Sequence, residues 1–130
     1  MASYPEELKY TKDHEWARAS GSRVTVGITE HAQEQLGEVV YVELPKVGET
    51  VTKGEPFGVV ESTKAVSELF SPVSGKVVEV NDPLTDSPAT INEDPYEEGW
   101  MIQVEATQPG DLEDLMNAKA YVEFIEEEAE

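Results

Sequence analysis

Cysteine is absent from this 130-residue chain, and histidine occurs only at His14 and His31. The lack of cysteine excludes disulfides, thiolate metal sites and cysteine nucleophiles supplied by the protein itself. The two histidines form neither an H-x-H nor an H-E-x-x-H pattern, so the sequence does not predict a zinc or other metal site. We expect His31 to be a surface residue of a short helix, without a catalytic role.

Basic residues are scarce as well. The chain has 9 Lys and Arg residues against 28 Asp and Glu residues, which gives a net charge of −19. Nucleic-acid binding requires a basic surface, and an anionic membrane would repel such a chain. We therefore expect neither nucleic acid nor membrane as a partner. The acidity favours a soluble monomer that is attracted to basic surfaces on partner proteins.

Long apolar segments are also missing, since no run approaches the roughly 20 residues of a membrane span. The first residues are acidic and have no basic region followed by an apolar core. They resemble neither a secretory signal nor a mitochondrial transit peptide. The expected location is the bacterial cytoplasm, and the alternative is the mitochondrial matrix for a mature form whose leader has been removed.

What the chain does contain is a series of short strand patterns separated by glycine and proline. In residues 24–28, for example, valine and isoleucine alternate with polar or small residues, as in a half-buried strand. Many such strands predict a mainly β fold of two packed antiparallel sheets with short peripheral helices. The length predicts one domain over residues 1–130. The pattern Gly-x-Val-Val-x-Val begins at Gly37 and again at Gly75, which suggests an internal two-fold arrangement.

Helices are indicated in two regions. Thr29 and Gly37 are suited to begin and end a helix over residues 30–36. Near the C-terminus, Asp111 and Asn117 can each cap a helical segment, and the second carries the apolar stripe of Tyr121, Phe124 and Ile125. Residues 82–89 are rich in turn formers and are expected to be irregular, residues 92–99 to be a loop, and residues 100–104 to be the last strand.

The most informative stretch predicts a β-hairpin. Two segments rich in β-formers, residues 57–61 and 65–70, flank a short polar centre, and glycine and proline turn signals bracket them. This arrangement places Lys64 at the tip. The alternative is that Lys64 is an ordinary solubilising lysine of a turn.

The residues around Lys64 resemble a known attachment site. The sequence Glu61-Ser62-Thr63-Lys64-Ala65, followed by Ser-Pro-Val-Ser-Gly-Lys-Val, is similar to the lipoyl-attachment hairpin of the lipoyl and biotinyl carrier fold. Further segments, from about Tyr10 to the C-terminus, resemble glycine cleavage system H proteins: Tyr10-Thr-Lys-Asp-His-Glu-Trp16, Gly27-Ile-Thr29 with Ala32-Gln33 and Leu36-Gly37, Val42-Glu-Leu-Pro45, Asn92-Glu-Asp-Pro-Tyr96 and Gly99-Trp-Met101.

This resemblance implies a lipoyl-type barrel-sandwich hybrid with a core over about residues 24–104 and a C-terminal helical segment over about 111–128. It also implies that Lys64 carries lipoic acid as an amide on its ε-amino group. The chain would then be a non-catalytic swinging-arm carrier of glycine cleavage.

The resemblance also implies the partners. The pyridoxal-phosphate-dependent glycine decarboxylase (P protein) loads an aminomethyl group, the tetrahydrofolate-dependent aminomethyltransferase (T protein) removes it, and dihydrolipoyl dehydrogenase (L protein) reoxidises the arm. A lipoate ligase or a lipoyl/octanoyl transferase would attach the lipoyl group.

The loaded arm carries an amine, and a cation favours carboxylates nearby. The candidates are Glu15, Glu68 and the weaker Asp13, although each could be an ordinary surface charge. Members of the family often carry Asp at the position of Glu68, and Val is commoner than Thr63 before the lysine.

Several alternatives remain at this point. A lipoyl domain of 2-oxoacid dehydrogenases commonly reads Asp-Lys-Ala, so Thr63 and the H-type flanking segments argue against it. A biotinyl domain has Met on both sides of the lysine, so Thr63 and Ala65 argue against its usual form. An H-like lipoyl donor in lipoate metabolism and an unmodified interaction domain are also compatible with the sequence. A small acid–base enzyme using His14 with Glu15 or Asp13 is disfavoured, because adjacent strand residues point to opposite faces.

Overall fold

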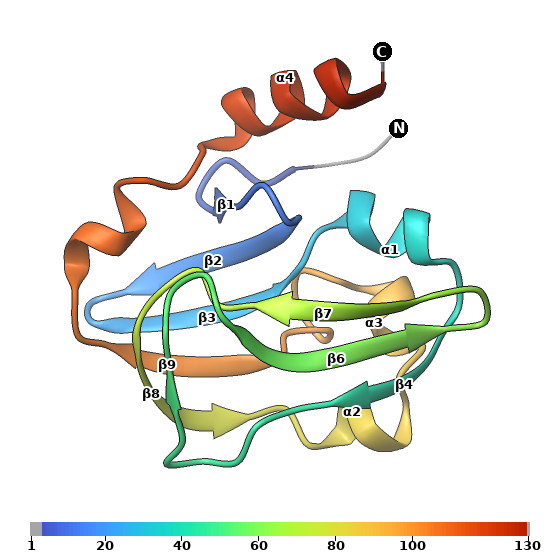
Figure 1. The fold of residues 1–130 in the computed structure, drawn as a ribbon, viewed down its shortest axis with the longest axis horizontal. Helices are drawn as coiled ribbons and strands as arrows, with labels where there is room; N and C mark the ends of the chain where they lie inside the picture. The colour runs from blue at the N-terminus through green and yellow to red at the C-terminus, as the bar shows by residue number, and fades with distance from the viewer. Residues whose placement is uncertain (1–3, 130) are drawn as a thin grey trace.

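The protein, described by a computed structural model over residues 4–129, consists of two antiparallel β-sheets with short helices around them and one longer helix at the C-terminus (Figure 1). The expected domain boundaries extend to residues 1–3 and 130, which lie outside the described range. The strands are β1 (Lys9–Tyr10), β2 (Glu15–Ser20), β3 (Arg23–Ile28), β4 (Val39–Glu43), β5 (Thr50–Val51), β6 (Pro56–Ser62), β7 (Val66–Phe70), β8 (Gly75–Val80) and β9 (Ile102–Ala106). The helices are α1 (Glu30–Leu36), α2 (Pro83–Asp86), α3 (Thr90–Glu93), the 3₁₀ turn η1 (Pro109–Leu112) and α4 (Ala118–Ala129).

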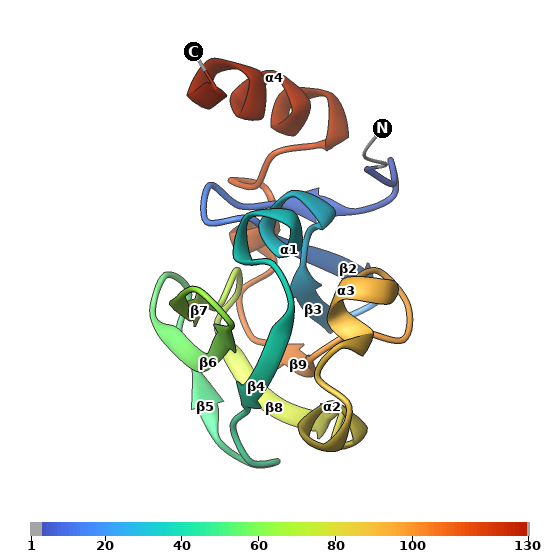
Figure 2. The same ribbon diagram turned by 90° about the vertical axis from the view of Figure 1, so that its right-hand side faces the viewer.

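The two sheets differ in size and enclose the main core. The larger has the strand order β1-β2-β3-β9-β8-β5, and the smaller has the order β4-β6-β7 (Figure 2). The alternating apolar residues of β3 point inward, so Val24, Val26 and Ile28 are all buried. They pack with buried side chains of β4, β6, β7, β8 and β9. The prediction of a mainly β fold of two packed antiparallel sheets is confirmed.

The Gly-x-Val-Val-x-Val repeat falls on corresponding strands of different sheets. One copy forms β4 of the smaller sheet, and the other forms β8 of the larger sheet. The two copies therefore occupy opposite layers of the sandwich, as an internal two-fold arrangement requires.

A second cluster attaches α4 to the outer side of the larger sheet. Tyr10 and Tyr121 are fully buried, and their rings stack with centroids 4.6 Å apart and an interplanar angle of 7°. Trp16 is also fully buried, and its indole nitrogen donates a hydrogen bond to the carbonyl oxygen of Pro95 at 3.0 Å. Trp16 is therefore a core residue, and the apolar stripe of α4 packs in the same cluster, as its spacing indicated.

The predicted ends of the principal helices are largely confirmed. The hydroxyl of Thr29 accepts a hydrogen bond from the backbone N–H of Ala32 at the start of α1, and Gly37 follows the helix with φ = 81°. Asn117 accepts from the N–H of Ala120 at the start of α4. Asp111 is different: it lies inside η1, and its carboxylate accepts from the N–H of Ser74 instead of capping a following helix.

Three local expectations were wrong. The segment 82–89, expected to be irregular, contains the single turn α2, because a proline at the first helical position is preorganised for helix. The expected loop over 92–99 begins inside α3. The strand-like pattern of residues 10–16 predicts a strand at the start of the fold, but a turn separates β1 from β2, and His14 adopts φ = 71° within it.

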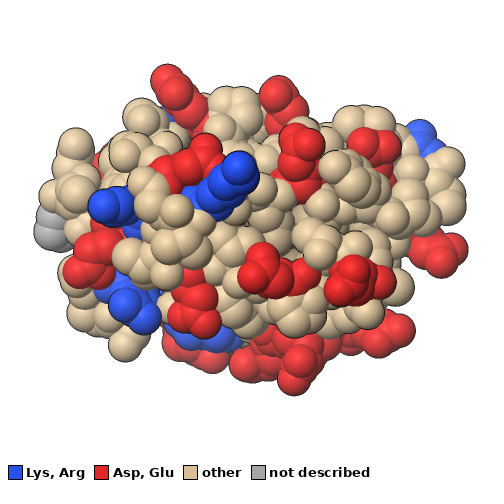
Figure 3. All heavy atoms as spheres, turned by 90° about the horizontal axis from the view of Figure 1, so that it is seen from below, with Lys and Arg blue, Asp and Glu red and all other residues tan. Residues whose placement is uncertain are grey.

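The acidic residues are distributed over the surface. On the face shown in Figure 3, Asp and Glu side chains are spread widely, whereas most of the Lys and Arg side chains gather towards one side. None of the helices in the described range is long and apolar enough to cross a membrane.

Candidate functional site

The predicted lysine hairpin is formed by β6 and β7, with Lys64 exposed in the three-residue connection (Figure 1). Ser62 organises this connection. Its backbone N–H donates to the carbonyl oxygen of Ala65 at 2.8 Å, and its hydroxyl oxygen accepts from the N–H groups of Lys64 and Ala65 at 3.2 and 3.0 Å. The backbone that carries Lys64 is therefore fixed, while the ammonium group remains in solvent.

A second set of contacts holds the hairpin tip against the segment that joins α1 to β4. The backbone N–H of Thr63 donates to the carbonyl oxygen of Glu38 at 3.1 Å. Gly37 lies beside the lysine stem, because a Cβ atom at this position would be 3.3 Å from Cε of Lys64. Asn92 supports the segment from behind: it accepts from the N–H of Val39 and donates to the carbonyl oxygen of Gly37, each at 2.8 Å.

A cleft of about 300 Å³ lies next to the hairpin. It runs between β7 and α1, towards the turn that precedes β2. Its apolar lining comes from β3, α1, β6, β7 and the hairpin connection: Ile28, Ala32, Leu36, Val60, Ala65, Val66 and Leu69. Its polar lining includes all three carboxylates predicted as candidates, Asp13, Glu15 and Glu68. The tertiary fold thus brings carboxylates of the N-terminal motif and of the lysine hairpin to one cleft.

Glu15 differs from the other two candidates because it is buried, with 1% of its surface exposed. One carboxylate oxygen accepts from the hydroxyl of Thr11 at 2.6 Å, and the other accepts from the backbone N–H of Phe70 at 3.1 Å. Burial raises the pKa of Glu15 to about 7, although these two hydrogen bonds oppose the shift and favour the charged form. A carboxyl group that titrates near neutral pH therefore lies in the cleft wall.

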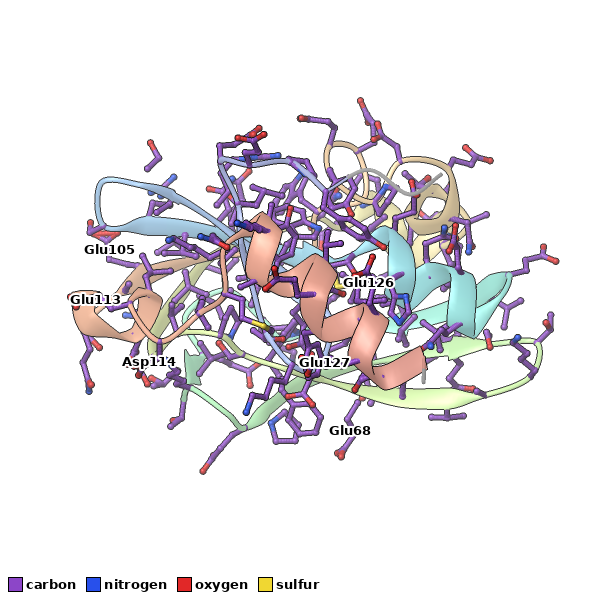
Figure 4. The ribbon with its side chains drawn as sticks, turned by 90° about the horizontal axis from the view of Figure 1, so that it is seen from above. Glu68, Glu105, Glu113, Asp114, Glu126 and Glu127 are labelled. Atoms are coloured by element: carbon purple, nitrogen blue, oxygen red, sulfur yellow. The ribbon has the colours of Figure 1, made fainter. Side chains whose placement is uncertain are left out.

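Asp13 and Glu68 are exposed at the edges of the cleft. Glu68 pairs with Val59 across the hairpin, and its side chain projects outward from β7 (Figure 4). These two carboxylates are hydrated, so they can attract a cation from solvent at little desolvation cost.

Sequence reasoning missed two parts of this site. Thr11, which holds Glu15, lies inside the N-terminal motif but carried no separate signal. The apolar lining was missed because its members belong to strands and a helix whose neighbours the periodicity does not reveal. Val66 is an exception that could have been found, because it is an apolar residue only two positions from Lys64 at the predicted hairpin tip. In the structure its side chain is 68% exposed, as in a contact surface.

Comparison with known proteins agrees with this geometry. Residues 8–128 match the protein family described as Glycine cleavage H-protein. The chain belongs to this family. The H-protein resemblance inferred from the Tyr10–Trp16 segment and the lysine hairpin is thereby confirmed.

Individual H proteins are similar over nearly their whole length. The glycine cleavage system H protein of Anaeromyxobacter sp. (strain K) is 70% identical over 124 residues, which cover 95% of this chain and 97% of that protein. The H protein of Myxococcus xanthus is 60% identical over 122 residues, which cover 94% of this chain and 95% of that protein. The crystal structure of an H protein from Mycobacterium marinum superposes with a TM-score of 0.85, at 48% identity, over 92% of this chain and 97% of that chain.

Proposed function

We propose that this H protein is the lipoylated swinging-arm carrier of the glycine cleavage system and that Lys64 is its attachment residue. One observation carries the proposal: Lys64 is exposed at a hairpin tip, beside a cleft that is lined by apolar side chains and three carboxylates. An attaching enzyme needs an accessible ammonium group on a defined backbone. A long, mostly apolar arm needs a surface on which its load can rest.

The residues around Lys64 fit lipoic acid. The hydroxyl of Ser62 satisfies the backbone of the tip without covering the lysine side chain. The apolar lining near the tip, including Val60 and Val66, suits a hydrocarbon arm. The lipoyl group, when bound, would supply the disulfide chemistry, which is why a chain without cysteine can serve in thiol-dependent transfer.

The carboxylates that line the cleft are suited to hold the cationic load of the arm. Glu15 would provide a buried acceptor whose orientation is set by Thr11 and by the backbone of Phe70. Glu68 and Asp13 would contribute negative charge at the mouth. Together they would hold the amine away from bulk water, and tethering keeps it at high effective concentration.

In this role the chain performs no catalysis of its own and meets the glycine decarboxylase, the aminomethyltransferase and dihydrolipoyl dehydrogenase in turn, after a lipoate ligase or a lipoyl/octanoyl transferase has modified it. Successive partners require reversible interfaces, and the net charge of −19 favours basic partner surfaces. The relatives support a bacterial cytoplasmic location, although one relative, from Arabidopsis thaliana, carries the description mitochondrial.

The attachment site is tested by intact mass after incubation with a lipoate ligase, ATP and lipoic acid. Wild type should gain one lipoyl group, and Lys64→Arg should gain none. Lys76→Arg, which changes an exposed lysine of β8, is the matched control and should be modified like wild type. Equal modification of Lys64→Arg would refute the assignment.

The carboxylate roles are tested by loading the lipoylated protein with glycine and decarboxylase, removing the enzyme, and following the loss of the loaded mass. Glu15→Gln should lose the load faster than wild type, and Glu68→Gln and Asp13→Asn should show smaller effects. Transfer of the lipoyl group from this chain to a second lipoyl-accepting protein, without activity in glycine decarboxylation, would favour the alternative role of lipoyl donor. Failure of both assays, together with a protein that takes no lipoyl group, would leave an unmodified interaction domain.

A further inference from the structure

Helix α4 passes over α1 (Figures 1 and 4). Two histidines and a glutamate converge in this region. His14 comes from the turn before β2, His31 from the first turn of α1, and Glu128 from the last turn of α4. One potential ligand atom from each lies within 4.8 Å of the other two. The two imidazole rings have centroids 4.7 Å apart, and Nε2 of His14 lies 3.4 Å from a carboxylate oxygen of Glu128.

The environment of His31 points to a missing partner. Its Nε2 atom is inaccessible to solvent and has no hydrogen-bond partner within residues 4–129. A buried ring nitrogen without a partner costs free energy, and native structures seldom retain one without a reason. Binding of a cation by this imidazole would supply the partner.

His14 is held in an orientation that suits a ligand. Its Nδ1 atom lies 2.8 Å from the hydroxyl of buried Tyr121, which lies 2.8 Å from the hydroxyl of Thr29. When Nδ1–H donates to Tyr121, the lone pair of Nε2 is free on the side of Glu128. This arrangement, in which the second nitrogen of a ligating histidine is fixed by a hydrogen bond, is typical of metal sites.

The backbone of His14 is fixed as well. The residue has φ = 71°, a value that residues other than glycine rarely adopt. Its N–H donates to the carbonyl oxygen of Thr11 at 3.1 Å, and its carbonyl oxygen accepts from the N–H of Thr29 at 3.0 Å. The turn thus presents the imidazole towards α1 and α4 before any ion binds.

We propose that His14, His31 and Glu128 bind one divalent transition-metal ion, with Zn²⁺ as the best match. Three atoms no more than 4.8 Å apart lie within about 2.8 Å of a common point (4.8 divided by the square root of three), whereas zinc bonds to nitrogen and oxygen measure about 2.0–2.2 Å. Inward shifts of less than about 1 Å close the site. Glu128, whose side chain is 46% exposed, lies at a helix end and can make most of this movement.

The chemistry of the ligands supports this choice. Two imidazoles and one carboxylate suit zinc and its late transition-metal neighbours better than Mg²⁺ or Ca²⁺, which prefer all-oxygen ligand sets. Three protein ligands leave a fourth position for water. The consecutive acidic residues of the last turn of α4, two of which are labelled in Figure 4, also attract a cation to this end of the helix.

The bound ion would link α4 to the wall of the arm cleft. His14 is one of the residues lining that cleft, and α4 otherwise reaches the β1–β2 region through the aromatic cluster of Tyr10 and Tyr121. The site therefore ties the C-terminal helix to the surface on which the arm would rest, without using Lys64.

The test measures Zn²⁺ binding to the untagged, unlipoylated full chain by competition with a chromophoric chelator. The wild type should bind one ion per chain. His31→Gln and Glu128→Gln should each weaken binding by at least about tenfold. Glu126→Gln, which removes the same charge from the same helix, is the matched control for Glu128→Gln and should weaken binding by no more than about twofold, because it removes long-range attraction but no ligand.

Nuclear magnetic resonance provides a second readout, because only two imidazoles exist in the chain. Zn²⁺ should shift the ring-nitrogen signals of both, and Nδ1 of His14 should remain protonated. Binding that is equally strong in the folded His31→Gln variant, or a stoichiometric ion that leaves both imidazole signals unchanged, would overturn the proposal. A wild-type protein that binds Zn²⁺ no more tightly than His31→Gln does would overturn it as well.

Discussion

Replacement of the buried Glu15 by glutamine should change how the stability of the protein depends on pH. The carboxyl group is 1% exposed, and its pKa is raised from 4.5 to about 7, chiefly by burial. Glutamine is similar in size and does not titrate. Its single amide oxygen can keep only one of the two native hydrogen bonds, from the N–H of Phe70 or from the hydroxyl of Thr11, and this loss lowers the stability of Glu15→Gln at every pH.

The direction follows from proton binding. Between pH 4.5 and 7 the folded protein holds a proton on Glu15 that the unfolded chain has released, so the free energy of unfolding falls as the pH rises. The stabilising contribution is complete below the unfolded pKa and is lost as the pH rises through the folded pKa. With 1.36 kcal/mol per pKa unit, this group alone should remove about 2 kcal/mol between pH 5 and pH 8.

Urea unfolding of unlipoylated protein in EDTA, at pH 5 and at pH 8, measures this effect. Repulsion among the other acidic residues also increases with pH, but wild type and Glu15→Gln share it. The wild type should therefore lose about 2 kcal/mol more than Glu15→Gln over this interval. Glu68→Gln, in which an exposed carboxylate is neutralised, should follow the wild-type dependence. A parallel loss of stability in wild type and Glu15→Gln would refute the argument that burial controls this carboxyl group.

Four further predictions rest on other contacts. Gly27→Ala should destabilise the fold by about 2 kcal/mol or more in urea unfolding, because the new Cβ would lie 2.6 Å from Cζ2 of buried Trp16. Asn92→Ala should cost about 3 kcal/mol by the same assay, since the N–H of Val39 and the carbonyl oxygen of Gly37 lose their partners. Gly37→Ala should lower stability by about 2 kcal/mol, because φ = 81° with ψ = −155° is a backbone conformation almost limited to glycine, and should slow lipoylation of the hairpin, because the new Cβ would lie 3.3 Å from Cε of Lys64. The KM of the lipoylated protein for the glycine decarboxylase should rise with ionic strength, because its charge of −19 is screened; a KM independent of salt would contradict electrostatic attraction.

Most strands, but not all of their connections, were predictable from the sequence. The alternation in β3 and the two apolar segments of β6 and β7 are local patterns, and the turn residues around them are equally local. Short helices such as α2 were missed because a single turn has too few residues to show a period. The break between β1 and β2 was missed because a non-glycine residue with positive φ, His14, has no signature in the sequence.

The position of Lys64 at a hairpin tip was predictable because a hairpin is a local structure with recognisable turn residues. The state of Glu15 was not. Burial in a core made of residues distant in the sequence raises its pKa, and the hydrogen bond from the equally distant Phe70 opposes this shift. Asp13, Glu15 and Glu68 are chemically similar, and only the fold distinguishes the buried Glu15 from the two exposed carboxylates.

The mainly β class, the lysine hairpin and the family could be recognised from the sequence, because they depend on alternation, turn residues and motifs that act within a few residues. The surroundings of the hairpin depend on the packing of distant segments. This packing closed a cleft between β7 and α1, buried Glu15, and placed His31 against His14 and Glu128 although the sequence suggested an isolated surface residue. The physical reason is that burial, pKa shifts and ligand geometry arise from long-range packing, which no local pattern encodes.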